Sequence, residues 1–270
     1  MNSHIAPSAI ITALLASLLT PGCFAVANLD RFEIDDVPCS ATEAETRDYN
    51  YLVRDLTTPH RNQLFEMKVV EDATGRVAAV IVYDGVPDNM ATPVQGTLTN
   101  ALAPGTYKTR FWADLTMDRD FQRFVGGAGD HGWVEDVPPS GCFQFDHMAP
   151  FIGNVAPTDD RSRGNIRVSL IGLGDAIGDA LIVRARLIPA TGSEIEVGFY
   201  RLDPIPTTTT DARATLNLYD VAIVEKSYAI TAFVDKNRNG SLDTGEPSFS
   251  PAAQAALPAD ALFELDLAAR

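Results

Sequence analysis

The sequence predicts an all-β protein built from two β-sandwich domains in tandem. Three observations lead to this prediction. Short segments rich in β-branched and aromatic residues follow one another, with turn residues between them. These segments recur at a nearly constant offset along the chain, which indicates an internal repeat. The composition, 46% hydrophobic and 21% charged, is typical of a folded globular chain and excludes a disordered one.

The first 27 residues predict a signal peptide. Residues 9–19 form an apolar run that is too short to span a bilayer comfortably, and Ala25-Val26-Ala27 is a small-residue cleavage pattern. A second interpretation uses Cys23, because Leu19–Cys23 looks like a degraded lipobox whose cysteine would carry a lipid. We therefore expect a secreted or cell-surface protein, or an outer-membrane lipoprotein.

The charge of the chain narrows the classes of partner. A formal net charge of -15 repels nucleic acid phosphates and anionic membrane surfaces. Metal cations are natural partners of such a surface. The macromolecular partner we expect is an extracellular protein or carbohydrate, with membrane contact only through a lipid on Cys23.

Two cysteines remain outside the leader region. Cys39 and Cys142 are expected to form a disulfide in an oxidising compartment, closing a loop of about a hundred residues that would stabilise the fold by roughly 4–5 kcal/mol. The alternative is a pair of buried thiols that are not bonded to each other.

The expected strands follow a polar, acidic lead-in at residues 28–58. Residues 64–70 and 76–83 flank a turn at Gly75 and predict a β-hairpin. Further strands are expected at residues 106–113, 133–137, 142–145, 165–171, 180–188, 195–200, 214–218, 228–234 and 261–267.

The repeat divides the chain into two similar halves. Tyr83 and Tyr200 match at an offset of 117 positions, and Asp114 and Asp235 match at an offset of 121. Seven or so short strands in each half favour Ig-like or transthyretin-like β-sandwiches. We expect a first domain at residues 28–153, a linker at residues 154–165, and a second domain at residues 166–270.

One loop in the second half predicts a calcium site. The stretch Phe233–Pro247 fits the pattern D-x-[DN]-x-[DN]-G-x5-E, with Gly240 at the sharp turn and Leu242 expected to anchor the loop to a core. Calcium takes six to eight oxygen ligands, which alternate residues of such a loop supply. The expected ligands are Asp235, Asn237, Asn239, Ser241, Asp243 and Glu246. The alternative is an Asx-rich turn without an ion.

The residues flanking this loop are not those of a helical calcium-binding motif. Residues 228–234 alternate like a strand, and Pro247 would interrupt a following helix. The loop resembles the calcium loops in the B repeats of staphylococcal serine-aspartate repeat adhesins. That resemblance covers Phe233–Pro247 and implies side-chain ligation by five of the six residues and carbonyl ligation by Ser241. The leader, the repeat and the complete loop together predict a calcium-stiffened structural or adhesive surface module.

The first half carries a degenerate copy of the loop. Arg119 replaces the glycine and Val125 replaces the closing glutamate, so a weaker second site is expected. Its candidate ligands are Asp114, Thr116, Asp118, Asp120 and Asp130. Residues 107–133, with "FWAD…DHGW", are also similar to predicted myxobacterial lipoproteins for which no activity can be inferred.

The alternative function is a secreted hydrolase with a structural calcium. It would use Asp130-His131 or Asp146-His147 as an Asp–His pair, although no nucleophile motif such as GxSxG accompanies them. Otherwise these histidines are expected to be solvated loop residues. Trp112 and Trp133 are expected in the core, with sugar stacking as the alternative. We therefore expect an exported calcium-binding module without catalytic activity.

Overall fold

A computed structural model describes residues 46–56, 60–86, 94–139, 142–147, 153–157, 160, 162–206, 213–249 and the backbone of residues 261–266. The predicted signal peptide, Cys23 and Cys39 lie outside these residues. Cys142 is partly buried just before a strand, and its disulfide with Cys39 stays a prediction. Within the described residues, no helix combines the length and the apolar character needed to cross a membrane.

The described residues form an all-β protein, as predicted. One short 3-10 turn, η2 (Gly174–Ala176), accompanies the strands. The strands are β1 (Arg47–Arg54), β2 (Leu64–Glu71), β3 (Val77–Asp84), β4 (Val94–Leu102), β5 (Tyr107–Ala113), β6 (His131–Asp136), β7 (Phe143–Asp146), β8 (Gly164–Ile171), β9 (Ala180–Ile188), β10 (Ile195–Leu202), β11 (Ala214–Ala222), β12 (Ser227–Asp235), β13 (Ser248–Phe249) and β14 (Ala261–Asp266).

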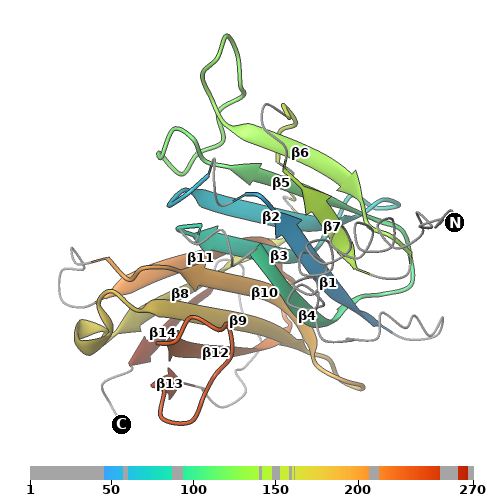
Figure 1. Ribbon diagram of the computed structural model, residues 1–270. Coiled ribbons are helices and arrows are strands. Elements are labelled where there is room, and N and C mark those ends of the chain that lie inside the picture. The colour runs from blue at the N-terminus through green and yellow to red at the C-terminus, as the bar shows by residue number, and fades with distance from the viewer. Residues whose placement is uncertain are drawn as a thin grey trace, which may run out of the picture. The chain divides into compact units, whose positions relative to one another are not determined.

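Both halves contribute to one large sheet. Its eight strands run in the order β13-β12-β9-β10-β3-β2-β5-β6, and two three-stranded sheets have the orders β4-β1-β7 and β11-β8-β14 (Figure 1). Each strand of the first half has an equivalent seven places later, so β3 matches β10 and β5 matches β12. The strand order is therefore symmetric about the junction between β3 and β10.

The β3–β10 junction is a parallel pairing in which Val82 faces Tyr200, an offset of 118 positions. The sequence repeat has an offset of 117, because Tyr83 matches Tyr200. Successive side chains of a strand point to opposite faces of the sheet. That difference of one position therefore makes equivalent residues of the two halves face opposite sides of the large sheet.

Two hydrophobic cores follow from this geometry, one on each face of the large sheet. One core holds Ile81 and Phe199, together with the small sheet β4-β1-β7. The other holds Val82 and Tyr200, together with strands β8 and β11. Each half is thus a β-sandwich, and the two sandwiches share one continuous sheet.

Buried polar contacts tie the halves together. Lys68 on β2 donates from Nζ to Oδ2 of Asp220 on β11 at 2.6 Å, and Glu66 lies 3.7 Å away. Glu196 on β10 is 1% exposed and accepts hydrogen bonds from the Thr99 backbone of β4 and from Arg184. Lys68 of the first half thus binds a carboxylate of the second, and Glu196 of the second half accepts hydrogen bonds from both halves.

The segment predicted as a linker, residues 154–165, contacts the first half at two places. The Val155 backbone N–H donates to the Gly132 carbonyl. The buried Asp160 carboxylate accepts the backbone N–H of Val77 at 3.0 Å. The prediction of two domains divided at this segment stays a prediction.

Three strands lie where none was expected. β1 falls within residues 28–58, which were predicted to be a polar lead-in, β4 follows a loop after the first hairpin, and the two-residue β13 follows the predicted calcium loop. Asn50 in β1 is buried, and its side chain accepts a hydrogen bond from Thr97 in β4. A polar residue that is satisfied inside the sandwich removes the alternation by which a strand is recognised.

Four strands of the large sheet end at the same end of the sheet. β3, β5, β10 and β12 run in the same direction, so their last residues, Asp84, Ala113, Leu202 and Asp235, all lie at that end. β6 begins there with His131 opposite Ala113. Both candidate loops, residues 114–130 and 236–247, therefore start from the same end of the sheet.

Loss of Lys68 is expected to destabilise the protein strongly. Lys68→Met leaves the Asp220 and Glu66 carboxylates buried without their cation, which should lower the free energy of unfolding by about 3–5 kcal/mol. Urea unfolding of Lys68→Met, Asp220→Asn and the double variant measures the loss and the coupling between the two residues. The matched control is Lys108→Met, whose exposed partner Asp136 stays in water and whose change should be negligible. Equal losses in the two lysine variants would contradict this expectation.

Candidate metal centres

The predicted calcium loop begins at Asp235, the last residue of β12. The Asp235 side chain is fully buried, and its two oxygens accept the backbone N–H groups of Asn239 at 3.1 Å and Gly240 at 2.9 Å. Arg201 lies 3.4 Å from Asp235 Oδ2 and also pairs with Asp203 at 2.8 Å. Gly240 has a φ of 82°, a conformation that favours glycine.

The other predicted ligands lie at the exposed surface around this turn. Glu246 accepts the backbone N–H of Lys236 at 2.8 Å with one oxygen and that of Asp243 at 2.9 Å with the other. Asp243 accepts both the Asn237 and the Asn239 amide N–H groups at 2.7 Å. To ligate a cation, these two amides have to rotate and present their oxygens.

The loop is therefore closed by its own hydrogen bonds. The structure brings the predicted residues into one turn between β12 and β13, with the first and last carboxylates fixing the backbone. The expectation that Leu242 anchors the loop to a core is wrong, because that side chain is 51% exposed. Asp235 anchors the loop instead.

The degenerate loop of the first half has the same starting turn. Asp114, 1% exposed, accepts the backbone N–H groups of Met117 at 2.7 Å and Arg119 at 2.8 Å. Arg119 has a φ of 66° where the second half has Gly240. Its guanidinium lies 2.9 Å from Asp84, outside the loop.

The remaining candidates of the first loop are also held by hydrogen bonds. Asp130 is fully buried and accepts the backbone N–H groups of Leu115, Thr116 and Gln122 at 2.6–3.2 Å. The backbone N–H of Asp120 donates to Asp118 and lowers the pKa of that carboxyl group. The Asp114 and Asp130 carboxylates thus shape this loop by binding its backbone.

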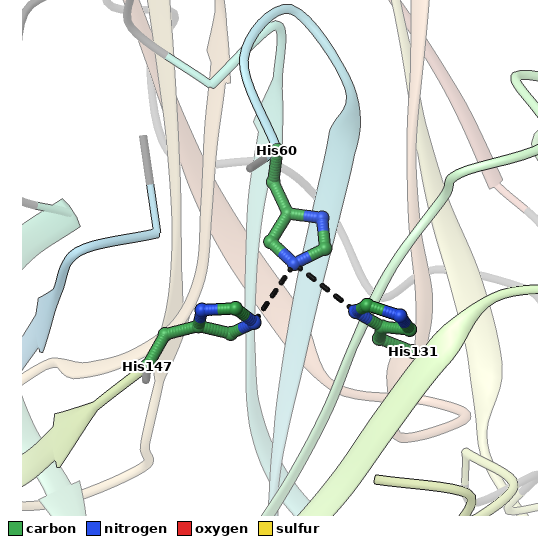
Figure 2. A group of neighbouring side chains, drawn as sticks. All are labelled: His60, His131 and His147. Atoms are coloured by element: carbon green, nitrogen blue, oxygen red, sulfur yellow. Dashed lines mark hydrogen bonds between the residues drawn. The ribbon is translucent and has the colours of Figure 1, made fainter. Parts of the chain in front are cut away.

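A second group of candidate ligands consists of three histidines. His60 lies in the turn between β1 and β2, His131 begins β6, and His147 directly follows β7 (Figure 2). His60 Nε2 lies 3.1 Å from His147 Nε2 and 3.3 Å from His131 Nδ1. One nitrogen from each ring can be chosen so that all three lie within 4.8 Å of one another.

The three rings are buried in an aromatic environment. The exposed fractions of His60, His131 and His147 are 0%, 9% and 3%. The ring of Trp133 meets all three edge-on at centroid distances of 5.4–6.0 Å, and Phe124 packs on His131. Burial lowers the pKa of His60 to about 4 and lowers the pKa of the other two histidines as well. The rings are therefore neutral at pH 7.

The interpretation of His131 and His147 as solvated loop residues is wrong. The Asp–His pairs of the hydrolase alternative are not joined by the hydrogen bonds of the described residues, since Asp130 binds three backbone N–H groups and Asp146 pairs with Arg54 at 3.3 Å. Each histidine instead faces His60. No spacing motif links the three, because they are 71 and 16 positions apart.

The two tryptophans lie in the core, as expected. Trp133 is 2% exposed, and Trp112 is 5% exposed with its indole N–H donating to Glu66. Trp112 contributes to an open pocket of about 370 Å³, next to Phe121 and the partly exposed Tyr219. Little of either indole surface is therefore left for stacking on a sugar.

No family model matches the chain, and neither does any curated protein. Among solved structures, a candidate adhesin from Bacteroides ovatus is 6% identical with a TM-score of 0.22, over 82% of this chain and 92% of that one. The fimbrial anchor protein Mfa2 from Porphyromonas gingivalis is 10% identical with a TM-score of 0.25, over 76% of this chain and 82% of that one. These scores are too low to support an argument about function.

Asp130 is expected to act as an acceptor for the backbone, with or without calcium. Asp130→Ala leaves three backbone N–H groups without their acceptor and should cost roughly 2–5 kcal/mol of unfolding free energy. Thermal unfolding in excess calcium and in chelator should show the same loss, with the exposed Asp120→Ala as the control. A loss seen only in calcium would assign Asp130 to an ion instead.

Proposed function

We propose that this chain is an exported β-sandwich module of the cell surface, with a structural or adhesive role and without catalytic activity. Its loop from Asp235 to Glu246 holds one calcium ion. The observation that carries this proposal is the closed turn of the loop, in which its first and last carboxylates are already fixed against the backbone.

The local geometry supports calcium at this loop. Asp235 binds the backbone at the fourth and fifth residues after it, and Glu246 binds the backbone of Lys236. Rotation of two exposed amides turns their oxygens inward, where they join the carboxylates of Asp243 and Glu246. The donors are then oxygens alone, the ligand type that calcium requires.

The charge balance of the loop supports a bound cation. Asp235 shares Arg201 with Asp203, while Asp243 and Glu246 hold only N–H donors in the described contacts. A divalent ion would neutralise these two carboxylates. At the millimolar calcium outside cells, a loop with a dissociation constant of about 0.1–1 mM stays occupied, which favours rigidity over signalling.

The partner we propose is an extracellular protein or carbohydrate. The charge of -15 supports a partner other than nucleic acid. The hydrolase alternative is disfavoured because Asp130 and Asp146 are engaged away from the histidines.

Calcium is expected to raise the melting temperature by about 3–10 °C at 10 mM. This range follows from a dissociation constant of about 0.1–1 mM, which gives about 1.4–2.7 kcal/mol of stabilisation. Calorimetric titration and thermal unfolding measure both quantities. Glu246→Gln and Asp243→Asn keep the side-chain sizes and should abolish most of the shift.

The matched control is Asp175→Asn, which removes an exposed carboxylate of the same half outside the loop. It should leave the calcium response unchanged. Absence of heat and of any thermal shift in the parent protein would refute the calcium site, whereas a shift that persists in Glu246→Gln would place the ion elsewhere.

Processing of the leader is expected to leave a mature chain that begins at Asn28, or at a lipidated Cys23. Intact mass spectrometry of protein from the native envelope distinguishes these products by mass. Alkylation without reduction should leave Cys39 and Cys142 unlabelled, because the proposed disulfide blocks both thiols. A mass that retains residues 1–22 would contradict export through this leader.

A further inference from the structure

We propose that His60, His131 and His147 form a binding site for one transition-metal ion, with Zn²⁺ as the representative ion. The ligand atoms are His60 Nε2, His131 Nδ1 and His147 Nε2, which the dashed lines of Figure 2 connect through His60. This site is separate from the calcium loop, because it lies in the first half and offers nitrogen donors.

The distances suit a tetrahedral ion after a small movement. Two nitrogens bound at the usual Zn–N distance of about 2.0–2.1 Å lie about 3.3–3.4 Å apart around a tetrahedral centre. The two pairs that involve His60 measure 3.1 and 3.3 Å. One nitrogen from each ring can be chosen so that all three lie within 4.8 Å of one another, which is about 1.4 Å more than the tetrahedral separation.

The hydrogen bonds of the cluster are unbalanced without an ion. His60 Nδ1 lies 2.8 Å from Gln63 Oε1, which accepts hydrogen bonds only, so Nδ1 carries a proton and Nε2 is the nitrogen left to bind an ion. His60 Nε2 then has one lone pair, yet two ring nitrogens face it. One of them can donate to that lone pair, and the other is left opposing it. A metal ion that accepts a lone pair from each ring removes this conflict.

One ligand has the outer contact of a histidine metal site. Gln63 holds the remaining nitrogen of His60, the kind of contact that orients ligating histidines, whereas His147 Nδ1 is buried without a hydrogen-bond partner among the described residues. The donor set of three neutral imidazoles suits Zn²⁺ and its first-row neighbours and does not suit Ca²⁺. Three protein ligands leave a fourth position on a tetrahedral ion for water or another donor.

The proposed ion would link the two sheets of the first sandwich at one end. His131 belongs to the large sheet, His147 follows a strand of the small sheet, and His60 lies in the turn that connects the two sheets. A single ion bound to all three would join both layers. In the second half Ile177 is the match to His60, and residues 148–270 contain no histidine, so the site belongs to the first half alone.

The test is a zinc titration of the mature chain after removal of metals by chelator. Calcium at 10 mM is kept in the buffer so that the oxygen loop does not contribute. Gel filtration followed by metal analysis should show one Zn²⁺ per chain, and bound Co²⁺ should show the visible absorption of a tetrahedral ion. At zinc a thousandfold above its dissociation constant, the melting temperature should rise by about 8–16 °C.

Four variants test the site. His60→Gln and His147→Gln should each weaken zinc binding by at least a hundredfold, and Gln63→Ala should weaken it by about 10–100-fold. Phe124→Leu, which changes packing on His131 without removing a donor, should bind within threefold of the parent. Circular dichroism checks that each variant is folded. If a histidine variant does not fold, Gln63→Ala decides the outcome, because it leaves all three rings in place.

Two results would overturn the proposal. One is a parent protein that retains no zinc at 10 µM free ion, and the other is a folded His60→Gln that binds zinc as the parent does. Both are independent of the calcium loop, whose failure would be seen as a missing calcium response with zinc binding intact.

Discussion

The parallel pairing of β3 with β10 is the contact on which the rest of the structure depends. It continues the sheet of one half into the other, and its offset of 118 against a repeat of 117 puts equivalent side chains on opposite faces. Each half therefore covers its own face with its own small sheet, and neither core has to accommodate the other. Because the strands run in the same direction, the equivalent loops of both halves emerge from the same end of the large sheet.

The two halves share the same turn, but the loops that follow it carry different side chains. Asp114 and Asp235 are both buried, and both accept backbone N–H groups of the following residues. That shared role is structural, which explains why the aspartate is present in the first half although its loop lacks a glycine and a closing glutamate. The oxygen-rich loop belongs to the second half, and the histidine cluster belongs to the first.

Much of the fold could be predicted from the sequence, because most strands alternate and the repeat is visible in the residue types. β1 and β4 could not, since their buried positions include Asn50 and since Gly96 lies against the Tyr51 ring, where a Cβ would come within 2.6 Å of the hydroxyl. The calcium loop could be predicted because its candidate ligands all lie within twelve residues of one another. The histidine cluster was missed for the opposite reason: its members come from a turn, the start of β6 and the end of β7, and only the topology brings them together. The members of each Asp–His pair are neighbours in the sequence, whereas the three histidine rings are brought together only by the fold.

The two candidate sites differ in the chemistry of their donors, and this separates the ions they would select. The loop from Asp235 to Glu246 offers oxygens at an exposed surface, where a hard ion such as Ca²⁺ keeps part of its water shell and binds at millimolar concentration. The histidines offer nitrogen lone pairs beneath Trp133 and Phe124, where an ion has to lose nearly all its water and only strong imidazole bonds compensate. Neither donor set can replace the other, so both ions can be bound at once. Both sites lie at the same end of the large sheet, but five strands separate β12, which carries the oxygen loop, from β6, which begins with His131, so each ion would act on its own half.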